Sequence, residues 1–205
     1  MIAVIDYGVG NLFSLSQSLK KVGAEAVVTS DFETIKSADK LILPGVGAFG
    51  DASKKLKGSG LGELIKSECT KGKPLLGICL GMQLLFDKSY EYGEYEGLGL
   101  IKGEVLPLSD YVAGRKIPHM GWNSLEFVDN NPIFRNLQQG DYVYFVHSYF
   151  AKCDEGLSAT TEYGIKVTAA VRKNNIFGVQ FHPEKSGNKG LEILRAFNNL
   201  EKVNL

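Results

Sequence analysis

Cys79 is the residue of this chain best placed for nucleophilic chemistry. It is the centre of residues 77–81 (GICLG), where an apolar segment typical of a buried strand meets a segment with helical spacing. The pattern G-x-C-x-G predicts a tight strand-turn-helix, because the backbone of such a turn leaves little room for neighbouring Cβ atoms. The turn would lift the thiol clear of the sheet and set it at a helix N-terminus, whose partial positive charge favours the thiolate. The alternative is a buried structural cysteine between two closely packed glycines.

The other cysteines lack this setting. Cys69 falls in an amphipathic helical segment and Cys153 lies beside charged loop residues, so a structural role is expected for both. The three cysteines are an odd number and form no CxxC pair, which disfavours a disulfide framework and a zinc site. We therefore expect no metal.

A cysteine nucleophile needs a base, and the base needs a group that orients its ring. His182 ends an apolar segment and is followed by Pro183 and Glu184. Proline biases the residue before it toward extended backbone, in which side chains two positions apart point to the same side. Glu184 is then placed to accept a hydrogen bond from one ring nitrogen of His182, and the other nitrogen is free to face a thiol. These residues predict a Cys79-His182-Glu184 triad.

The remaining histidines are weaker candidates for the base. His119 has no acidic residue nearby in the sequence, and His147 alternates along a predicted strand. From the residues alone, each is better interpreted as a satisfied core or surface histidine.

Acyl transfer needs hydrogen-bond donors where negative charge develops. The N–H of Leu80, next to the nucleophile, is one candidate. Residues 43–50 (LPGVGAFG) follow a predicted strand, and their glycines allow backbone amides to turn toward a ligand. An ordinary glycine-rich turn is the alternative, and only its position near Cys79 favours a functional loop. Residues 8–10 (GVG) are similar to the start of a dinucleotide fingerprint, but Phe13 stands where the third glycine would be.

The first half of the chain alternates strand and helix patterns that would position these residues. Strands are predicted at 2–6, 25–29, 40–43 and 74–78, and helices after Asn11, within 49–71 and at 80–87. This βαβ rhythm predicts a parallel sheet with helices on both faces. Ligands of such sheets bind at the carboxyl ends of the strands, which is where Cys79 falls.

The second half is richer in strands and closes with a helix. Strands are predicted at 104–107, 122–127, 141–147, 157–162, 167–173 and 176–181, and the closing helix at 189–200. We predict a single α/β domain over residues 1–205, with a mostly parallel central sheet, flanking helices and antiparallel strand additions.

The composition excludes several classes of protein. The 205 residues are 44% hydrophobic and 22% charged, as in ordinary globular chains that bury a core without staples. Basic and acidic residues number 23 each and no basic block stands out, so nothing favours a nucleic-acid or anionic-membrane partner. The N-terminus lacks the basic start of a signal peptide, and no apolar run reaches the length of a bilayer span. We expect a cytoplasmic protein.

Taken together, these motifs resemble the class I (triad) glutamine amidotransferases. The matching segments are the proline-glycine loop at Pro44, GICLGMQ at 77–83 and FHPEKS at 181–186. Further segments are similar to those of the glutaminase subunits of imidazole glycerol phosphate synthase: DYGVGN at 6–11, PGVGAFG at 44–50, PHMGWN at 118–123 and YFVHSY at 144–149. The resemblance spans nearly the whole chain and implies a flavodoxin-like α/β architecture.

The resemblance implies a role for each residue of the site. Cys79 attacks the side-chain amide of glutamine and releases ammonia, His182 moves protons, and Glu184 orients His182. No cofactor and no metal are implied. The backbone donors to the oxyanion would be Leu80 with Val46 or Gly47, and the residues that bind glutamine would be Gln83, His147, Ser148 and Tyr149.

The resemblance also implies a partner. Ammonia would pass to a separate cyclase subunit, a TIM barrel, in a heterodimer. That partner forms imidazole glycerol phosphate and an aminoimidazole carboxamide ribonucleotide in histidine biosynthesis. The positions that match the partner-facing residues of the family are Asn11, Met120, Trp122 and Lys185.

Three other interpretations compete with this one. The chain could be a class I glutaminase of another synthase, such as one for pyridoxal phosphate, although PGVGAFG and PHMGWN disfavour this. It could be a stand-alone cysteine peptidase or γ-glutamyl hydrolase on the same fold, because the chain has no synthase domain of its own. It could also be a catalytically inactive binding module, against which the intact Cys79, His182 and Glu184 argue.

Overall fold

Strands from both halves of the chain form one eight-stranded sheet in the computed structural model, which describes residues 1–200. The last five residues of the predicted 1–205 domain lie outside the described residues. Five neighbouring strands are parallel, in the order β2 (Ala26–Thr29), β1 (Ile2–Ile5), β3 (Lys40–Leu43), β4 (Leu75–Ile78) and β14 (Ile176–Val179). Antiparallel strands extend the sheet beyond β14: β13 (Lys166–Lys173), β12 (Leu157–Glu162) and β9 (Glu126–Phe127).

The predicted fold class is confirmed by this topology. The order β2-β1-β3-β4 followed by a fifth parallel strand is the flavodoxin-like arrangement, and the antiparallel strands are additions on one side.

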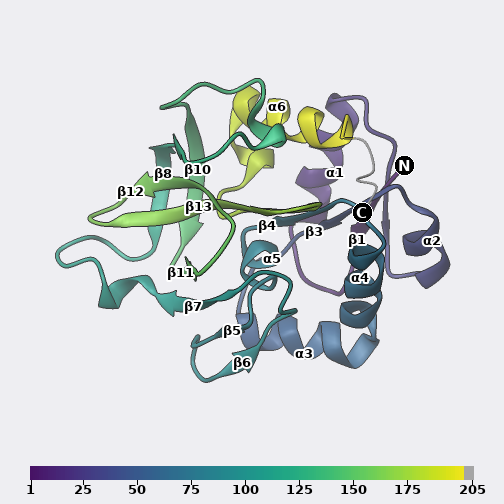
Figure 1. The fold of residues 1–205 in the computed structure, drawn as a ribbon, viewed down its shortest axis with the longest axis horizontal. Helices are drawn as coiled ribbons and strands as arrows, with labels where there is room; N and C mark the ends of the chain where they lie inside the picture. The colour runs from purple at the N-terminus through teal and green to yellow at the C-terminus, as the bar shows by residue number, and fades with distance from the viewer. Residues whose placement is uncertain (201–205) are drawn as a thin grey trace.

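Helices cover both faces of the parallel part (Figure 1). One face carries α1 (Leu12–Lys21) and α6 (Gly187–Asn198), and the other carries α2 (Phe32–Ser37), α3 (Phe49–Ser59) and α4 (Leu61–Thr70). The side chains of β1 show how the two layers form, because successive side chains along a strand point to opposite faces of the sheet. Ile2 and Val4 pack in the core under α1 and α6, whereas Ala3 and Ile5 pack in the core under α2, α3 and α4.

Two smaller sheets lie beside the antiparallel part. One pairs β8 (His119–Ser124) with β10 (Tyr142–His147), antiparallel. The other has the order β11 (Tyr149–Cys153), β7 (Gly103–Pro107), β5 (Lys88–Ser89) and β6 (Tyr95–Glu96). The short helix α5 (Leu80–Gln83) and the 3-10 helices η1 (Leu108–Asp110), η2 (Pro132–Phe134) and η3 (Pro183–Lys185) complete the elements.

The helix predicted at 80–87 is wrong in length, because α5 ends at Gln83. The carbonyl groups of residues 84–87 turn to a neighbouring segment instead of continuing a helix. Leu98 N donates to Leu84 O at 2.7 Å and Leu100 N donates to Leu85 O at 2.8 Å. Tertiary hydrogen bonds to residues 97–101 therefore end the helix early.

The strand predicted at 122–127 is also wrong, because two strands with different partners occupy this region. β8 begins at His119 and pairs with β10, whereas β9 is only Glu126–Phe127 and pairs with β12. The strand predicted at 176–181 ends at Val179, and the closing helix runs two residues earlier than predicted. The elements α2, β5, β6 and β11 were not predicted.

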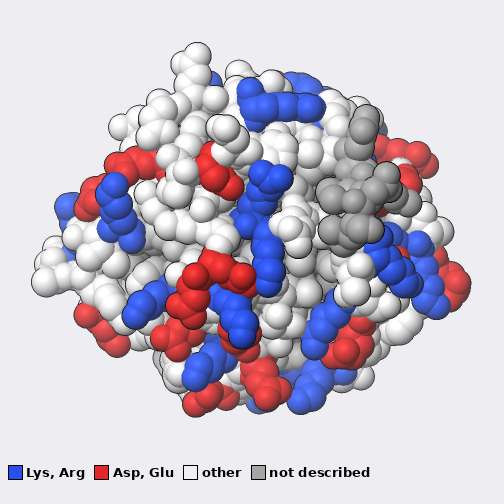
Figure 2. All heavy atoms as spheres, in the orientation of Figure 1, with Lys and Arg blue, Asp and Glu red and all other residues white. Residues whose placement is uncertain are grey.

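The surface shows no large block of one charge on the face drawn in Figure 2, where basic and acidic side chains are interspersed among the described residues. Within residues 1–200, no helix combines the length and the apolar character needed to cross a bilayer.

Candidate active site

Cys79 occupies the sharp turn between β4 and α5 with a strained backbone. Its φ of 54° and ψ of −111° lie where non-glycine residues are rare. The turn is held by a hydrogen bond from Cys79 N to Val179 O at 2.8 Å. A Cβ atom on Gly81 would lie 1.8 Å from Leu43 O, so only glycine fits at the end of the G-x-C-x-G pattern. The predicted elbow is present.

His182 and Glu184 are brought together by a turn. Nδ1 of His182 donates to Oε1 of Glu184 at 2.8 Å, and both side chains are almost fully buried. The hydrogen bond predicted from the sequence is present, but its local geometry differs from the prediction. His182 itself is extended, at φ −104° and ψ 98°, yet η3 begins at the next residue, so the chain bends toward Glu184.

The environment of His182 makes it a strong proton acceptor. Burial by itself lowers the pKa of His182, but the neighbouring Cys79 and the hydrogen-bonded carboxylate of Glu184 raise it to about 9. A histidine next to a cysteine is the arrangement of a nucleophile with its base.

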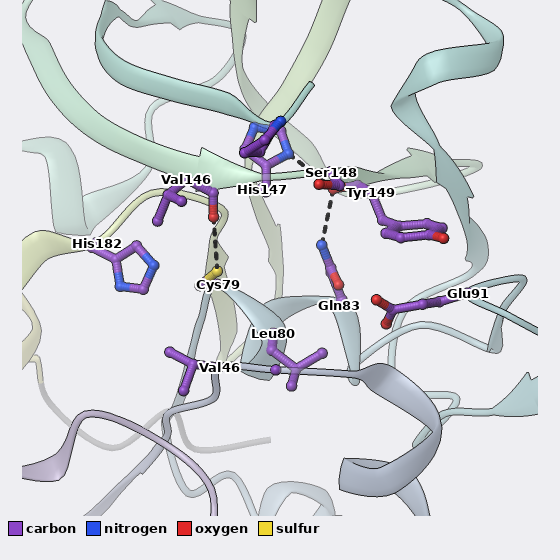
Figure 3. A pocket seen from close by; sticks show the side chains of 12 residues that line it. Val46, Cys79, Leu80, Gln83, Glu91, Val146, His147, Ser148, Tyr149 and His182 are labelled. Carbon is purple, nitrogen blue, oxygen red and sulfur yellow. Dashed lines mark hydrogen bonds between the residues drawn. The ribbon is translucent and has the colours of Figure 1, made fainter. Parts of the chain in front are cut away.

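A cavity of about 310 Å³ opens over Cys79 and His182 (Figure 3). It is bounded by α5, by the loop after β3 and by the chain from β10 to β11. Every residue predicted to donate to the oxyanion or to bind glutamine lines this cavity: Val46, Gly47, Leu80, Gln83, His147, Ser148 and Tyr149.

The proline-glycine loop reaches the cavity by packing directly on the elbow. A Cβ atom on Gly45 would lie 2.9 Å from both Gly81 N and Leu80 Cβ. The hydroxyl of Tyr7 donates to Pro44 O at 2.7 Å and anchors the start of the loop. Gly47 has a φ of 95°, which a residue with a side chain rarely adopts.

Glu91 is a residue of the site that the sequence did not reveal. Its carboxylate lines the cavity and accepts a hydrogen bond from Phe49 N at 2.5 Å. Burial raises the pKa of this carboxyl above its usual value. Residues 88–96 carry no motif, and only the folding of β5 and β6 against α3 brings Glu91 to the cavity, so no signal in the sequence could have identified it.

The histidines set aside as structural have hydrogen-bond partners, as expected. Nδ1 of His119 lies 2.9 Å from Nε2 of His147, and the His119 ring is stacked between Phe145 and Tyr163. Burial lowers the pKa of His119 to about 4 and that of His147 to about 3. Both are therefore neutral near pH 7.

The other cysteines are also free thiols, and burial dominates their environment. Burial raises the pKa of Cys69 to about 12 and that of Cys153 to about 11. Within residues 1–200, no group of three or more His, Cys, Asp or Glu residues is arranged to hold a metal ion.

The residues predicted to face a partner all lie at the surface. Met120 and Trp122 are 61% and 55% exposed on β8. Trp122 packs edge-on against Tyr144, and the Lys185 ammonium lies 6.0 Å from the centre of the same ring. Asn11 is exposed at the start of α1, where its side chain accepts a hydrogen bond from Ser14 N.

Comparisons with known proteins place the chain in a family. The family model of glutamine amidotransferase class-I matches residues 3–199. An imidazole glycerol phosphate synthase subunit HisH from Caldanaerobacter subterraneus is 53% identical over 98% of this chain and 99% of that protein. The HisH subunits of Lactococcus lactis and Aquifex aeolicus are each 52% identical, over 98% and 95% of this chain and 98% and 94% of their own lengths.

Solved structures show the same fold at low sequence identity. PurLQS from Thermotoga maritima superposes with a TM-score of 0.71 at 22% identity, over 97% of each chain. A structure described as a glutamine amidotransferase gives a TM-score of 0.75 at 20% identity, over 96% of this chain and 97% of that one. With near full-length identity above 50% to HisH subunits, this chain is a glutamine amidotransferase of class I and belongs to the family of HisH subunits of imidazole glycerol phosphate synthase.

Proposed function

We propose that this enzyme hydrolyses glutamine with Cys79 as nucleophile, His182 as proton carrier and Glu184 as the group that orients His182. One observation carries the proposal. A cysteine on a strained elbow and a histidine held by a buried carboxylate face the same cavity, and a cysteine with such a base is the arrangement used for acyl transfer.

The reaction proceeds in two stages. The Cys79 sulfur attacks the side-chain amide carbon of glutamine, and His182 gives a proton to the nitrogen as the C–N bond breaks. Ammonia leaves, and the glutamyl group remains as a thioester on Cys79. A water molecule, which passes a proton to His182, then attacks the thioester. Glutamate leaves, and the proton on His182 balances the regenerated sulfur anion.

Backbone amides would stabilise the oxyanion of each stage. Leu80 N–H lies directly after the nucleophile at the start of α5, and the loop of Val46 and Gly47 lines the same cavity beside it. Hydrogen-bond donors fixed in a water-poor site stabilise the oxyanion more strongly than water does, because they need no reorganisation during the reaction. We assign the second donor to Val46 or Gly47.

Glutamine would lie between the elbow and the wall formed by residues 146–149. Gln83, His147, Ser148 and Tyr149 line that side of the cavity. Glu91 adds a carboxylate at the same cavity, opposite in charge to the α-ammonium group of an amino acid.

The ammonia would pass to a synthase partner, since the relatives are named as subunits of imidazole glycerol phosphate synthase. The partner we propose is the TIM-barrel cyclase subunit, in a one-to-one heterodimer, which uses ammonia to form imidazole glycerol phosphate and an aminoimidazole carboxamide ribonucleotide. The docking residues would be Asn11, Met120, Trp122 and Lys185. We further propose that residues 1–205 form one domain and that the enzyme works in the cytoplasm.

Covalent labelling with a glutamine-like diazoketone tests the site. Mass spectrometry of the labelled protein should find the adduct on Cys79, and an excess of glutamine should slow its formation. An adduct on Cys69 or Cys153, or labelling of Cys79 that glutamine does not slow, would contradict the proposed site.

A further inference from the structure

The carbonyl oxygen of Tyr149 joins two branches of one hydrogen-bond chain. It accepts from Nε2 of Gln83 at 3.0 Å and lies 2.9 Å from Nδ1 of His147. A carbonyl oxygen only accepts hydrogen bonds, and its two lone pairs serve two donors. The atom of Gln83 at this contact is therefore its amide nitrogen, and Nδ1 of His147 carries the proton.

The first branch ends at the nucleophile. Nε2 of Gln83 also donates to Oε1 of Gln180 at 3.0 Å, and Nε2 of Gln180 donates to the Cys79 sulfur at 3.6 Å. Gln180 follows β14 and is fully buried, and its own N–H is fixed by Ala169 O. Because Gln83 presents a donor to Gln180, the near atom of Gln180 is its oxygen, and its nitrogen must face the sulfur.

This branch decides what Gln83 offers to the substrate. Both N–H groups of its amide are engaged with protein acceptors, so the group available to a ligand in the cavity is the carbonyl oxygen. That oxygen suits a donor such as the α-ammonium group of glutamine and disfavours a carboxylate.

The second branch ends on β8. Because Nδ1 of His147 donates, its Nε2 accepts from Nδ1 of His119, and Nε2 of His119 accepts from the Asn123 amide at 3.3 Å. The amide of Asn123 is itself fixed, since Nδ2 donates to Glu162 O at 2.8 Å and Oδ1 accepts from Ser124 N at 2.9 Å. The bond directions thus follow from backbone groups, the Tyr149 carbonyl where the branches meet and the partners of the Asn123 amide on β8.

The packing around His119 keeps this branch rigid. His119 is opposite His147 in the pairing of β8 with β10, and its ring is stacked between Phe145 and Tyr163. Each neutral imidazole donates once and accepts once, which is what the chain requires, and the lowered pKa values of both histidines keep them neutral.

We propose that His119, Asn123 and Gln180 are positioning residues, which act through one hydrogen-bond chain to fix the Gln83 oxygen toward the substrate and a donor toward the Cys79 sulfur. The proposal rests on the proposed glutaminase function. If His119 is lost, His147 has no donor at Nε2 and can shift its proton to that nitrogen. Nδ1 would then present a lone pair to Tyr149 O, and the wall that holds Gln83 would loosen.

His119→Phe tests the second branch, because a phenyl ring keeps the stacking and removes both hydrogen bonds. The measurement is kcat/KM for glutamine and for glutaramate, its analogue without the α-amino group, by the enzyme assembled with its synthase partner. We expect the preference for glutamine over glutaramate to fall about tenfold, equivalent to ~1.4 kcal/mol. A folded His119→Phe enzyme with the preference of the wild type would overturn the proposal.

Two neighbouring changes separate positioning from packing. His119→Asn keeps an amide N–H near the position of Nδ1 and should recover most of the preference. Tyr163→Phe keeps the ring that covers His119 and removes only the hydroxyl that donates to Lys116 O, so it should match the wild type. Equal loss in all three variants would mean that packing alone is responsible and would overturn the proposal.

Gln180→Met tests the first branch independently of His119. It frees one N–H of Gln83 and removes the donor at the sulfur, so both the preference for glutamine and kcat should fall. An unchanged preference would refute the first branch. Failure of the proposed function would give a different result. The wild-type enzyme would then release no glutamate from glutamine, or the Cys79→Ala variant would remain active.

Discussion

At the scale of single residues, the surroundings of each cysteine decide its chemistry. Only Cys79 lies on a strained elbow beside a histidine, whereas Cys69 and Cys153 lie in settings that favour the neutral thiol. We expect Cys79→Ala and Cys79→Ser to abolish glutamine hydrolysis with the fold intact, and Cys69→Ser and Cys153→Ser to keep most activity. Steady-state glutamate release, with circular dichroism as the control for folding, decides this. Substantial activity in Cys79→Ala would exclude Cys79 as the nucleophile.

The two members of the His182–Glu184 pair should differ in importance. His182→Asn loses the proton carrier, and general acid–base catalysis contributes about 10²–10⁴-fold to a rate. Glu184→Gln leaves nucleophile and base in place and weakens only the orientation of the ring, so its loss should be smaller. Measuring kcat of the two variants checks that His182→Asn loses more activity than Glu184→Gln. If His182→Asn kept normal activity while His147→Asn or His119→Asn were inactive, His182 would not be the base.

The surroundings of His182, with Cys79 and Glu184 as neighbours, should make stability depend on pH. The pKa of His182 is about 9 in the folded protein against an ordinary value of 6.5, so folding strengthens proton binding. The resulting stabilisation is complete below pH 6.5 and is lost as the pH rises from 6.5 to 9. The free energy of unfolding of the wild type minus that of His182→Asn should therefore shrink across this range. Denaturant titrations between pH 6 and 10 measure it, and a difference that grows with pH would disprove the assignment.

At the scale of elements, local patterns predicted most of what positions the triad. The strand before Cys79, the glycines around it and the His182–Glu184 contact all depend on residues within a few positions of one another. The early end of α5 and the true start of β8 depend on partners far away in the sequence, residues 97–101 and β10. Glu91 and Gln180 could not be identified for the same reason, because only the folded sheet brings them to the cavity or the sulfur.

The elbow should tolerate no side chain at Gly81. A Cβ atom there would meet Leu43 O at 1.8 Å, a distance that only a shift of the backbone can relieve. We expect Gly81→Ala to destabilise the protein by about 3 kcal/mol or more, because the added methyl group would clash with backbone atoms that cannot easily move away. Gly58→Ala is the matched control: Gly58 is exposed in α3 with no atom near the added methyl group, and alanine should stabilise that helix by about 0.5–1 kcal/mol. Thermal unfolding compares them, and a stable Gly81→Ala protein would contradict the packing of the loop on the elbow.

At the scale of the whole molecule, the proposed docking surface and the proposed substrate wall are two faces of the same strands. Met120 and Trp122 point outward from β8. His119, the first residue of β8, faces inward toward His147. β10, the partner of β8, leads directly into residues 146–149, which line the cavity. A protein that binds the outer face therefore contacts the strands that hold the proposed glutamine site.

This arrangement predicts a glutaminase that depends on its partner. Ammonia is useful only when a synthase is ready to consume it, and the glycines on both sides of Val46 allow a single peptide to rotate its N–H toward or away from the oxyanion. A gained oxyanion donor is worth about 10²–10³ in rate. We expect very slow glutamate release by the isolated subunit, and an increase on the order of a hundredfold or more when the cyclase docks and binds its nucleotide substrate.

Trp122→Ala should separate docking from chemistry. The indole is 55% exposed and packs on Tyr144 rather than on the triad, so its loss should weaken binding or activation by the cyclase and leave the basal rate of the isolated subunit unchanged. The decisive measurement is steady-state glutamate release by the isolated subunit, by the complex and by the complex with the cyclase ligand, for the wild type and for Trp122→Ala. Equal wild-type rates in all three states would eliminate the switch and leave a constitutive glutaminase. A wild-type response in Trp122→Ala would place the coupling surface elsewhere on the molecule.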